Sequence, residues 1–208
     1  MELPLEFKET TSRLLNDEFP SFIKALETTA PTSIRYNDKS DYVPAGSLVP
    51  WCPNAVYLPE RPLFTADPLF HAGAYYVQEA SSMFLREVVT QFFRCAETVL
   101  DLCAAPGGKS TLLAQTLSDN CMLVSNEIIR SRAYVLAENL NKWGRENTLV
   151  TNNDASAFGK LRHFFAAIVV DAPCSGEGMF RKDNAAISEW SPQNVEICAA
   201  RQKDILTD

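Results

Sequence analysis

The chain has 208 residues, 46% of them hydrophobic, which is ample for a packed core and excludes a disordered chain. No apolar run reaches the roughly 18 residues that span a bilayer, and MELPLEFKET at the start has neither a basic lead nor an apolar stretch, so a soluble cytoplasmic protein without a membrane partner is expected. The net charge of −7 argues against a broad nucleic-acid-binding face, so any RNA contact is expected from a local basic cluster, a specific pocket or further chain.

The first part of the chain, residues 1–73, predicts a small α+β domain. Apolar residues at helical spacing predict helices over its first 26 residues. A stretch rich in proline and aromatic residues, from Pro44 to Phe70, predicts short strands and loops. We place the domain boundary near Gly73. The residues that carry the helical spacing are Phe7, Leu14, Leu15, Phe19, Phe22, Ile23 and Leu26.

Residues 74–208 alternate short apolar runs with amphipathic helices, which predicts a parallel α/β sheet with helices on its faces. A helix is expected over residues 83–93. The first strand contains Val99 and Leu100 and ends at Asp101. The helix that follows is expected to begin near Lys109.

Three more strands and two helices follow in the predicted order. Strands are expected at 123–124, ending at Glu127, at 149–150 and at 166–170; the last is nearly all apolar, as expected for a strand buried on both faces. Gly144 is placed to end the helix after the second strand. The final helix opens with Ser191 and Pro192. Its inward face is expected to contain Val195, Cys198, Ala199, Ile205 and Leu206.

Polar residues stand at the carboxyl ends of these strands, where open α/β sheets bind ligands. In DLCAAPGGKST, Gly107 and Gly108 permit a tight turn before a helix, and this turn can receive a polar or anionic group. The spacing is neither GxGxxG nor GxxxxGK[ST], which disfavours dinucleotide and P-loop sites. Glu127 suits two ribose hydroxyls and Asp154 an exocyclic amine. The three strand ends together predict an adenosyl ligand.

Three segments carry a family resemblance. DLCAAPGGK at 101–109, the acidic Glu127 and DAPCSGEGMFRK at 171–182 resemble the Sun-type family of RNA (cytosine-5) methyltransferases, particularly the bacterial enzymes that modify small-subunit ribosomal RNA. HAGAYYVQEASSMF at 71–84 is similar to the segment that leads into that family's catalytic domain. The resemblance implies a Rossmann-like methyltransferase fold, of which the first four strands are expected here, that uses S-adenosyl-L-methionine to form 5-methylcytosine in ribosomal RNA.

The resemblance also implies which residues form the site. Cys174, Asp171 and Lys109 correspond to residues that act on the target cytosine. The expected cofactor contacts are Cys103, Ala104, Ala105, Pro106, Gly107, Gly108, Lys109, Glu127, Arg132, Asp154 and Asp171. If the family resemblance is set aside, Gly107 and Gly108 can form an ordinary turn, and Glu127 and Asp154 can be solvated surface charges.

Cytosine C5 is a poor nucleophile, so a thiolate must first add to C6 before C5 can attack a methyl group. The family divides the thiol chemistry between two cysteines. Cys174 matches the one in the Pro-Cys motif, which assists product release, with a buried structural thiol as the alternative. The Thr-Cys motif that attacks C6 is expected beyond Asp208, so this chain alone is expected to be inactive.

Three basic residues are candidate RNA contacts. Arg35, in TSIRYN, matches a family position near the RNA. Arg181 and Lys182 are candidates for phosphate contacts, with a plain surface pair as the alternative.

The six cysteines form no CxxC pair, so we expect free thiols and no metal site.

Three other functions are alternatives. A DNA cytosine-5 methyltransferase would use Cys174 as the nucleophile, but glutamine usually follows that cysteine, whereas Ser175 follows here. An amino-group methyltransferase would have an aromatic residue in place of Cys174. A non-catalytic module that binds S-adenosylmethionine or RNA stays open.

The expected half-sheet has consequences for association. If further strands are absent, the fourth strand is an edge with unpaired backbone groups, which favours association with another chain. Alternatively, the sequence is a fragment of a longer protein.

Overall fold

The computed structural model describes residues 2–207, which pack as two units. The first, here called the helical unit, groups the chain up to residue 30 with the chain from residue 172 onward. The second, the sheet unit, comprises residues 31–171. Among the residues described, no helix combines the length and apolar character needed to cross a bilayer.

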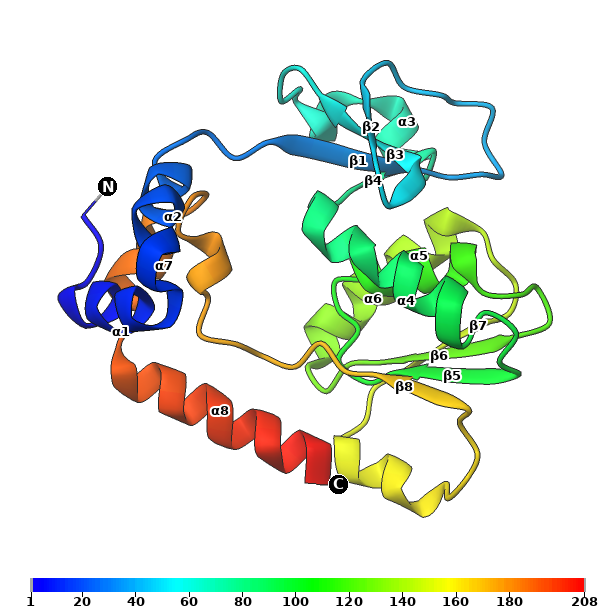
Figure 1. Cartoon of the computed structure of the whole chain (residues 1–208). Coiled ribbons are helices and arrows are strands. Elements are labelled where there is room, and N and C mark those ends of the chain that lie inside the picture. Colours follow the sequence, from blue (N-terminus) through cyan, green and yellow to red (C-terminus); the bar gives the residue numbers. More distant parts are fainter. Residues whose placement is uncertain (1, 208) are drawn as a thin grey trace. The chain divides into compact units, whose positions relative to one another are not determined.

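The helical unit brings together helices from both ends of the chain (Figure 1). Aromatic side chains from both ends form its core. Phe7 packs edge-on against Phe180 and Trp190, with ring centroids 5.1 and 5.6 Å apart. Leu3 completes the buried cluster. The elements of this unit are α1 (Leu5–Leu15), η1 (Asn16–Glu18), α2 (Phe19–Leu26), η5 (Glu177–Met179), α7 (Asn184–Glu189) and α8 (Pro192–Thr207).

Helix α8 begins as predicted and buries the predicted face only in part. The Ser191 Oγ accepts a hydrogen bond from the Asn194 backbone N–H at 3.2 Å, so Ser191 caps the first turn. Of the expected inward face, Val195, Cys198 and Ile205 are half-buried, whereas Ala199 and Leu206 are exposed, and no residue of α8 is fully buried. Leu206 is 70% exposed. The core of this unit instead takes its apolar groups from α1, α2, α7 and the residues beside them.

The sheet unit opens with an antiparallel sheet of four strands in the order β2-β3-β1-β4. Ile34, Val56, Phe64 and Tyr75 form its buried cluster. Two short helical segments connect β3 to β4. The bounds are β1 (Thr32–Tyr36), β2 (Ser47–Val49), β3 (Cys52–Leu58), η2 (Phe64–Ala66), α3 (Pro68–His71) and β4 (Tyr75–Val77).

This pairing conflicts with a boundary near Gly73. Strand β4 follows Gly73 in the chain but pairs with β1, with Ile34 opposite Val77 and Tyr36 opposite Tyr75. The predicted division between 1–73 and 74–208 therefore separates two hydrogen-bonded strands. It also joins the first two helices to this sheet, whereas they pack in the helical unit. Apolar periodicity locates elements but does not show which elements pair.

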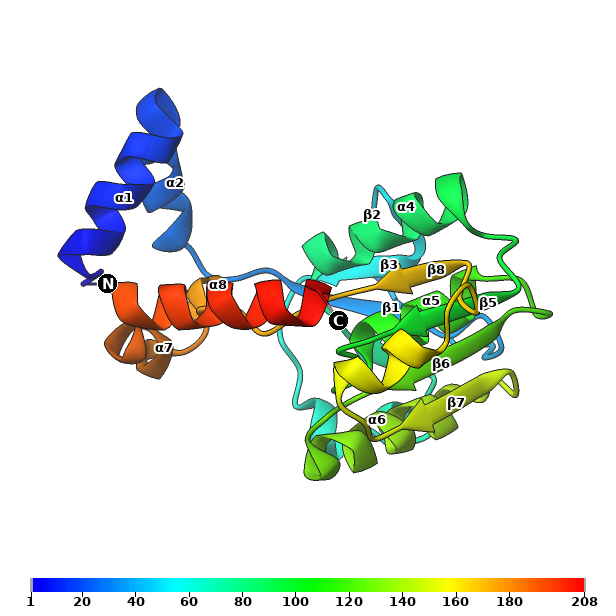
Figure 2. The same ribbon diagram turned by 90° about the horizontal axis from the view of Figure 1, so that it is seen from below.

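The second sheet is parallel, in the order β7-β6-β5-β8, and Figure 2 shows the strands side by side. Helices α4, α5 and α6 lie on one face of it (Figure 1). Val99, Leu113, Leu123 and Trp143 are among the residues buried between them. The bounds are η3 (Ala80–Phe84), α4 (Leu85–Phe92), β5 (Thr98–Asp101), α5 (Gly108–Thr116), β6 (Met122–Asn126), α6 (Arg130–Trp143), β7 (Thr148–Thr151), η4 (Ala155–Lys160) and β8 (Ala167–Val169).

The predicted strands and helices of this sheet are confirmed. The expectation that the strand at 166–170 is buried on both faces is wrong. Ile168 in β8 is 56% exposed and Leu149 in β7 is 52% exposed. They are in register with Leu100 and Val124 of the two central strands, so all four belong to the face opposite Val99 and Leu123. On that face, the described chain leaves the two outer strands open.

Candidate cofactor site at the strand ends

The parallel sheet brings the predicted cofactor residues to one edge. Because its strands run in the same direction, their carboxyl ends meet there. Asp101 ends β5, Glu127 follows β6, Asp154 follows β7 and Asp171 follows β8. A row of four acidic residues therefore lies along this edge.

The turn after β5 is held in place by its neighbours. Gly107 has a φ of 109°, a left-handed conformation that suits glycine, and α5 begins at the next residue. The Ala104 N–H donates to the Asn126 carbonyl oxygen at 2.8 Å, and the Gly107 N–H donates to the Ala104 carbonyl oxygen at 2.9 Å. Ala104 and Ala105 are buried against Leu136. The turn thus presents the first N–H groups of α5, which have no partner within the helix.

Two further residues of the turn were predicted as contacts. Cys103 is half-buried, and burial raises the pKa of its thiol, so the group stays neutral at pH 7. Pro106 presents its carbonyl oxygen to the Asn139 side-chain amide at 2.8 Å. Both residues stay predicted cofactor contacts.

Glu127 is a buried carboxylate, 3% exposed, at the end of β6. Its Oε1 accepts a hydrogen bond from the Ile129 N–H at 2.9 Å, and its Oε2 lies 3.4 Å from Arg132 Nη1. Arg132 also donates to the Ala105 carbonyl oxygen at 2.8 Å. Arg132 therefore connects Glu127 to the turn, which fits a role in positioning the carboxylate.

Asp154 has a different environment. It is exposed and caps η4, where its Oδ1 accepts hydrogen bonds from the Ser156 N–H at 3.0 Å and the Ser156 Oγ at 2.6 Å. The hydrogen bonds from Ser156 lower the pKa of Asp154. The carboxylate is therefore charged at neutral pH and held in one orientation, as an acceptor for an amine requires.

Lys109 and Asp171 face each other across the edge. Lys109 Nζ lies 2.5 Å from Asp171 Oδ2, and the Asp171 side chain is 57% exposed. This pair joins the first turn of α5 to the end of β8. The ammonium group keeps one carboxylate oxygen in place while the remainder of Asp171 faces solvent.

Two residues of this edge were missed from the sequence. Asp101 is fully buried; Ser110 Oγ donates to its Oδ2 at 2.6 Å, and no partner within residues 2–207 reaches its Oδ1. Burial raises the pKa of Asp101 to about 6. Asn126 Nδ2 donates to the carbonyl oxygens of Leu102 and Asn153, at 3.2 and 3.0 Å, and so links the loops after β5 and β7. A polar residue at the last position of a buried strand was the signal for both.

Arg35 does not present its guanidinium at the surface, as a direct RNA contact would require, because it is fully buried. Its guanidinium donates to Gln78 Oε1 at 3.0 Å, to Gln115 Oε1 at 2.5 Å and to Thr111 Oγ1 at 2.6 Å. It also lies 4.4 Å from the centroid of the Trp143 ring. The sequence around Arg35 did not reveal these partners, which come from β4, α5 and α6 or the residues beside them.

The remaining candidates belong to the helical unit. Arg181 Nη2 donates to Thr28 Oγ1 at 3.1 Å and to the Thr29 carbonyl oxygen at 3.0 Å, so it ties the two ends of the chain together. Lys182 is exposed. Cys174 is an exposed thiol, not a buried structural one. The RNA contacts of Arg181 and Lys182 and the role of Cys174 stay predictions.

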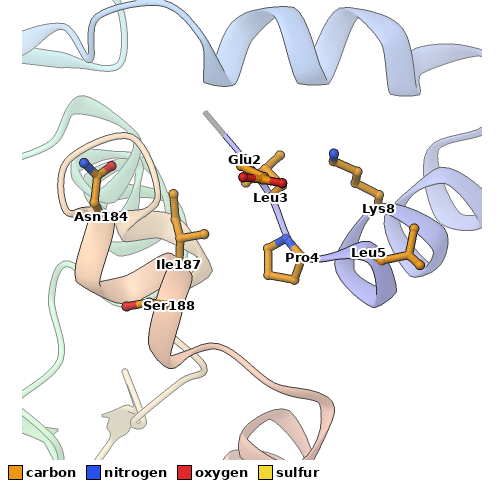
Figure 3. Close-up of a pocket in the computed structure, with 8 residues that line it drawn as sticks. All are labelled: Glu2, Leu3, Pro4, Leu5, Lys8, Asn184, Ile187 and Ser188. Atoms are coloured by element: carbon orange, nitrogen blue, oxygen red, sulfur yellow. The ribbon is translucent and has the colours of Figure 1, made fainter.

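One hollow of about 800 Å³ opens in the helical unit and contains none of the predicted site residues. Figure 3 shows the start of the chain on one side of it and α7 on the other. Its lining residues are Glu2, Leu3, Pro4, Leu5, Lys8, Asn184, Ile187 and Ser188. Within residues 2–207, no three His, Cys, Asp or Glu side chains gather in a way that could hold a metal ion.

Comparison with known proteins identifies the family. A family model described as 16S rRNA methyltransferase RsmB/F matches residues 93–208, and another, the N-terminal domain of 16S rRNA methyltransferase RsmF, matches residues 3–80. The chain belongs to the 16S rRNA methyltransferase RsmB/F family. The resemblance predicted from DLCAAPGGK and DAPCSGEGMFRK is therefore confirmed.

Two relatives of this RsmB/F chain show how much of a longer protein it covers. It is 38% identical over 226 residues to ribosomal RNA small subunit methyltransferase F of Pectobacterium carotovorum, covering 98% of this chain and 46% of that protein. The corresponding protein of Aeromonas hydrophila is 43% identical over 169 residues, or 76% of this chain and 34% of the relative. The chain thus spans less than half the length of these relatives.

A solved structure supports the predicted fold class. A methyltransferase homolog from Pyrococcus horikoshii covers 91% of this chain and 63% of its own, with a TM-score of 0.74 at 26% identity. The predicted Rossmann-like methyltransferase fold with an additional N-terminal α+β part is confirmed.

Proposed function

We propose that this chain carries the cofactor-binding part of an S-adenosylmethionine-dependent enzyme that forms 5-methylcytosine in RNA, with ribosomal RNA as its substrate class. The observation that carries the proposal is the edge of the parallel sheet, where four acidic residues and a glycine turn converge in a chain of the RsmB/F family. A cytoplasmic location follows from this substrate.

The residues of the edge fit an adenosylmethionine molecule. Its amino-acid part carries an ammonium group, and the buried Asp101 Oδ1 lacks a partner within the described chain. The turn ending at Gly107 offers N–H groups to a carboxylate. Glu127 would hold the ribose and Asp154 the exocyclic amine of the adenine. Bound there, the cofactor supplies an electrophilic methyl group.

Residues of this chain would prepare the cytosine. The Lys109 ammonium holds one oxygen of Asp171 at 2.5 Å, which leaves the other free to accept a hydrogen bond from the exocyclic amine of the base. We assign Cys174 to product release, in which its exposed thiol assists the departure of the methylated base. The attacking thiol belongs to another cysteine in this assignment.

Transfer of a radiolabelled methyl group from S-adenosylmethionine to unmodified ribosomal RNA tests the proposal. We would compare the 208-residue chain, its Cys174→Ser variant and the complete product of the gene. Activity of the complete product, with no transfer by the 208-residue chain or its Cys174→Ser variant, supports the assignment of the attacking thiol to another cysteine. Activity of the 208-residue chain that disappears in Cys174→Ser would make Cys174 the attacking thiol and contradict them.

A second candidate is a module that binds S-adenosylmethionine or RNA without transferring a methyl group. The chain covers only part of its relatives, 46% of one of them. This favours the binding module as the function of the chain in isolation. Cofactor binding by every protein tested, with no transfer by any of them, would support this function instead.

A further inference from the structure

A small polar cavity lies in the sheet unit, beside α4, α5 and the start of β3. Its volume is about 180 Å³. Arg86, Thr90 and Arg94 line it from α4 and its end, Gln115 lines it from α5, and Asn54 lines it from β3. Sites that enclose drug-sized ligands have volumes of roughly 300–1,000 Å³, so this cavity suits a group of only a few heavy atoms. None of the predicted cofactor contacts lines it.

The inner wall of the cavity carries a buried positive charge. Arg35 is fully buried, and its hydrogen-bond acceptors, among them Gln78, Gln115 and Thr111, are all neutral. A buried charge without an opposite charge is unfavourable, and burial lowers the pKa of Arg35 to about 10. An anion in the cavity would offset the unfavourable free energy of burying the Arg35 charge.

Two more arginines bring positive charge to the cavity mouth. Arg86 and Thr90 lie one turn apart on the same side of α4, and Arg94 follows shortly after the end of that helix. Half-buried Arg86 contacts the carboxylate of its exposed neighbour Glu87 at 3.2 Å, and an ion pair with an exposed partner contributes little free energy and competes weakly with other partners. This arrangement concentrates cations in a chain whose net charge is −7.

One acidic residue also lines the cavity. The Asp38 carboxylate, however, forms an ion pair with Arg145, which occupies its Oδ1. The thiol of Cys52 lies in the wall as well, and burial raises its pKa, so it contributes no negative charge at pH 7. The unpaired charge at the cavity is therefore positive.

We propose that this cavity binds a phosphate group, with the guanidinium groups of Arg86 and Arg94 as its donors and Arg35 as the charge behind them. The guanidinium fork matches the spacing of phosphate oxygens, and each donor is charged, which strengthens the hydrogen bonds. Asn54 and Thr90 can add neutral donors. The phosphate can come from an RNA backbone or from a free phosphate, and the site is distinct from the one that would hold the cofactor.

Thermal unfolding in the presence of inorganic phosphate tests the site. The test protein is Arg86→Gln/Arg94→Gln, and the matched control is Arg61→Gln/Arg162→Gln, which removes the same charge from exposed positions. At fixed ionic strength, phosphate should raise the melting temperature of the wild-type and control proteins, because a ligand of the native state stabilises it. This shift should be absent in Arg86→Gln/Arg94→Gln. The same shift in that variant, or none in the wild type, would overturn the proposal.

A second measurement distinguishes the two sources of phosphate. Binding of a fluorescent single-stranded oligoribonucleotide is followed over a range of salt concentrations. If RNA fills the cavity, Arg86→Gln/Arg94→Gln binds RNA more weakly than the control. The negative slope of log K against log salt also becomes shallower, by about 0.7 for each RNA phosphate that the variant no longer neutralises. A missing phosphate-induced shift with unchanged RNA binding would identify a free phosphate as the ligand. Neither outcome depends on adenosylmethionine binding.

Discussion

The carboxyl group of Asp101 is buried at the end of β5, and burial raises its pKa to about 6 from an ordinary value of 3.8. A carboxyl group whose pKa is higher in the folded protein stabilises that state when protonated. This contribution is present below about pH 4 and is lost as the pH rises through about 6.

Replacing Asp101 with Asn should remove this pH dependence. Relative to Asp101→Asn, the free energy of unfolding of the wild type should fall between about pH 4 and pH 6, by up to roughly 3 kcal/mol. Urea unfolding of both proteins at several pH values measures the difference. A constant difference across this range would show that Asp101 ionises as easily in the folded chain as in the unfolded one.

Arg35 illustrates a residue whose role depends on its partners. Arg35→Met should lower the free energy of unfolding by about 2–4 kcal/mol, because buried acceptors on Gln78, Gln115 and Thr111 lose their donor. Arg35→Lys should recover only part of this loss, since an ammonium group cannot reach all of these acceptors. Arg61→Met, at an exposed position, serves as the control in chemical denaturation. Equal effects at the two positions would contradict the hydrogen-bonded arrangement.

At the scale of single elements, the turn between β5 and α5 depends on Gly107. Alanine there would be forced into a left-handed conformation, which is unfavourable by roughly 1–2 kcal/mol. Its Cβ would also lie 3.2 Å from Leu136 Cδ1. Gly144→Ala is the matched control, because φ is also positive there but no atom lies within 4 Å of the added Cβ.

We therefore expect Gly107→Ala to destabilise the chain more than Gly144→Ala. We also expect only Gly107→Ala to weaken the binding of S-adenosylmethionine, because Gly144 lies at the end of α6 that is remote from the turn. Urea unfolding and calorimetry measure the two effects. Equal loss of affinity in both variants would mean that the turn does not contact the cofactor.

Elements and strand ends were predictable from the sequence because each depends on neighbouring residues. Apolar runs located β5 to β8, and their parallel order brought Glu127, Asp154 and Asp171 to one edge. The pairing of β4 with β1 was not predictable, because residues 32–36 and 75–77 carry no local signal of their partner. The burial of Arg35 was missed for the same reason: one of its partners, Gln115, lies 80 positions away.

At the scale of the whole molecule, β8 forms one edge of the parallel sheet within the described chain, and Ile168 on it is 56% exposed. An edge strand with an exposed apolar residue favours association with another chain. The family comparison does not address this point, so self-association stays a prediction.

Sedimentation velocity over a range of concentrations should show association of the 208-residue chain. Ile168→Lys should reduce it, because a charged side chain on an edge strand disfavours pairing. Met122→Lys, at a position 48% exposed on the central strand β6, is the control and should have less effect. A concentration-independent monomer in all three proteins would contradict this prediction.

The most direct test of the account is the affinity of the 208-residue chain for S-adenosylmethionine, measured by calorimetry. Glu127→Gln should weaken binding by roughly 10- to 100-fold, since hydrogen bonds to a charged group contribute about 1.5–3 kcal/mol. Asp154→Asn should also weaken it. Glu146→Gln, an exposed carboxylate before the amino end of β7 and so at the opposite edge of the sheet, should leave the affinity unchanged. If the chain binds no cofactor, or if all three variants bind equally well, the strand ends do not form the cofactor site.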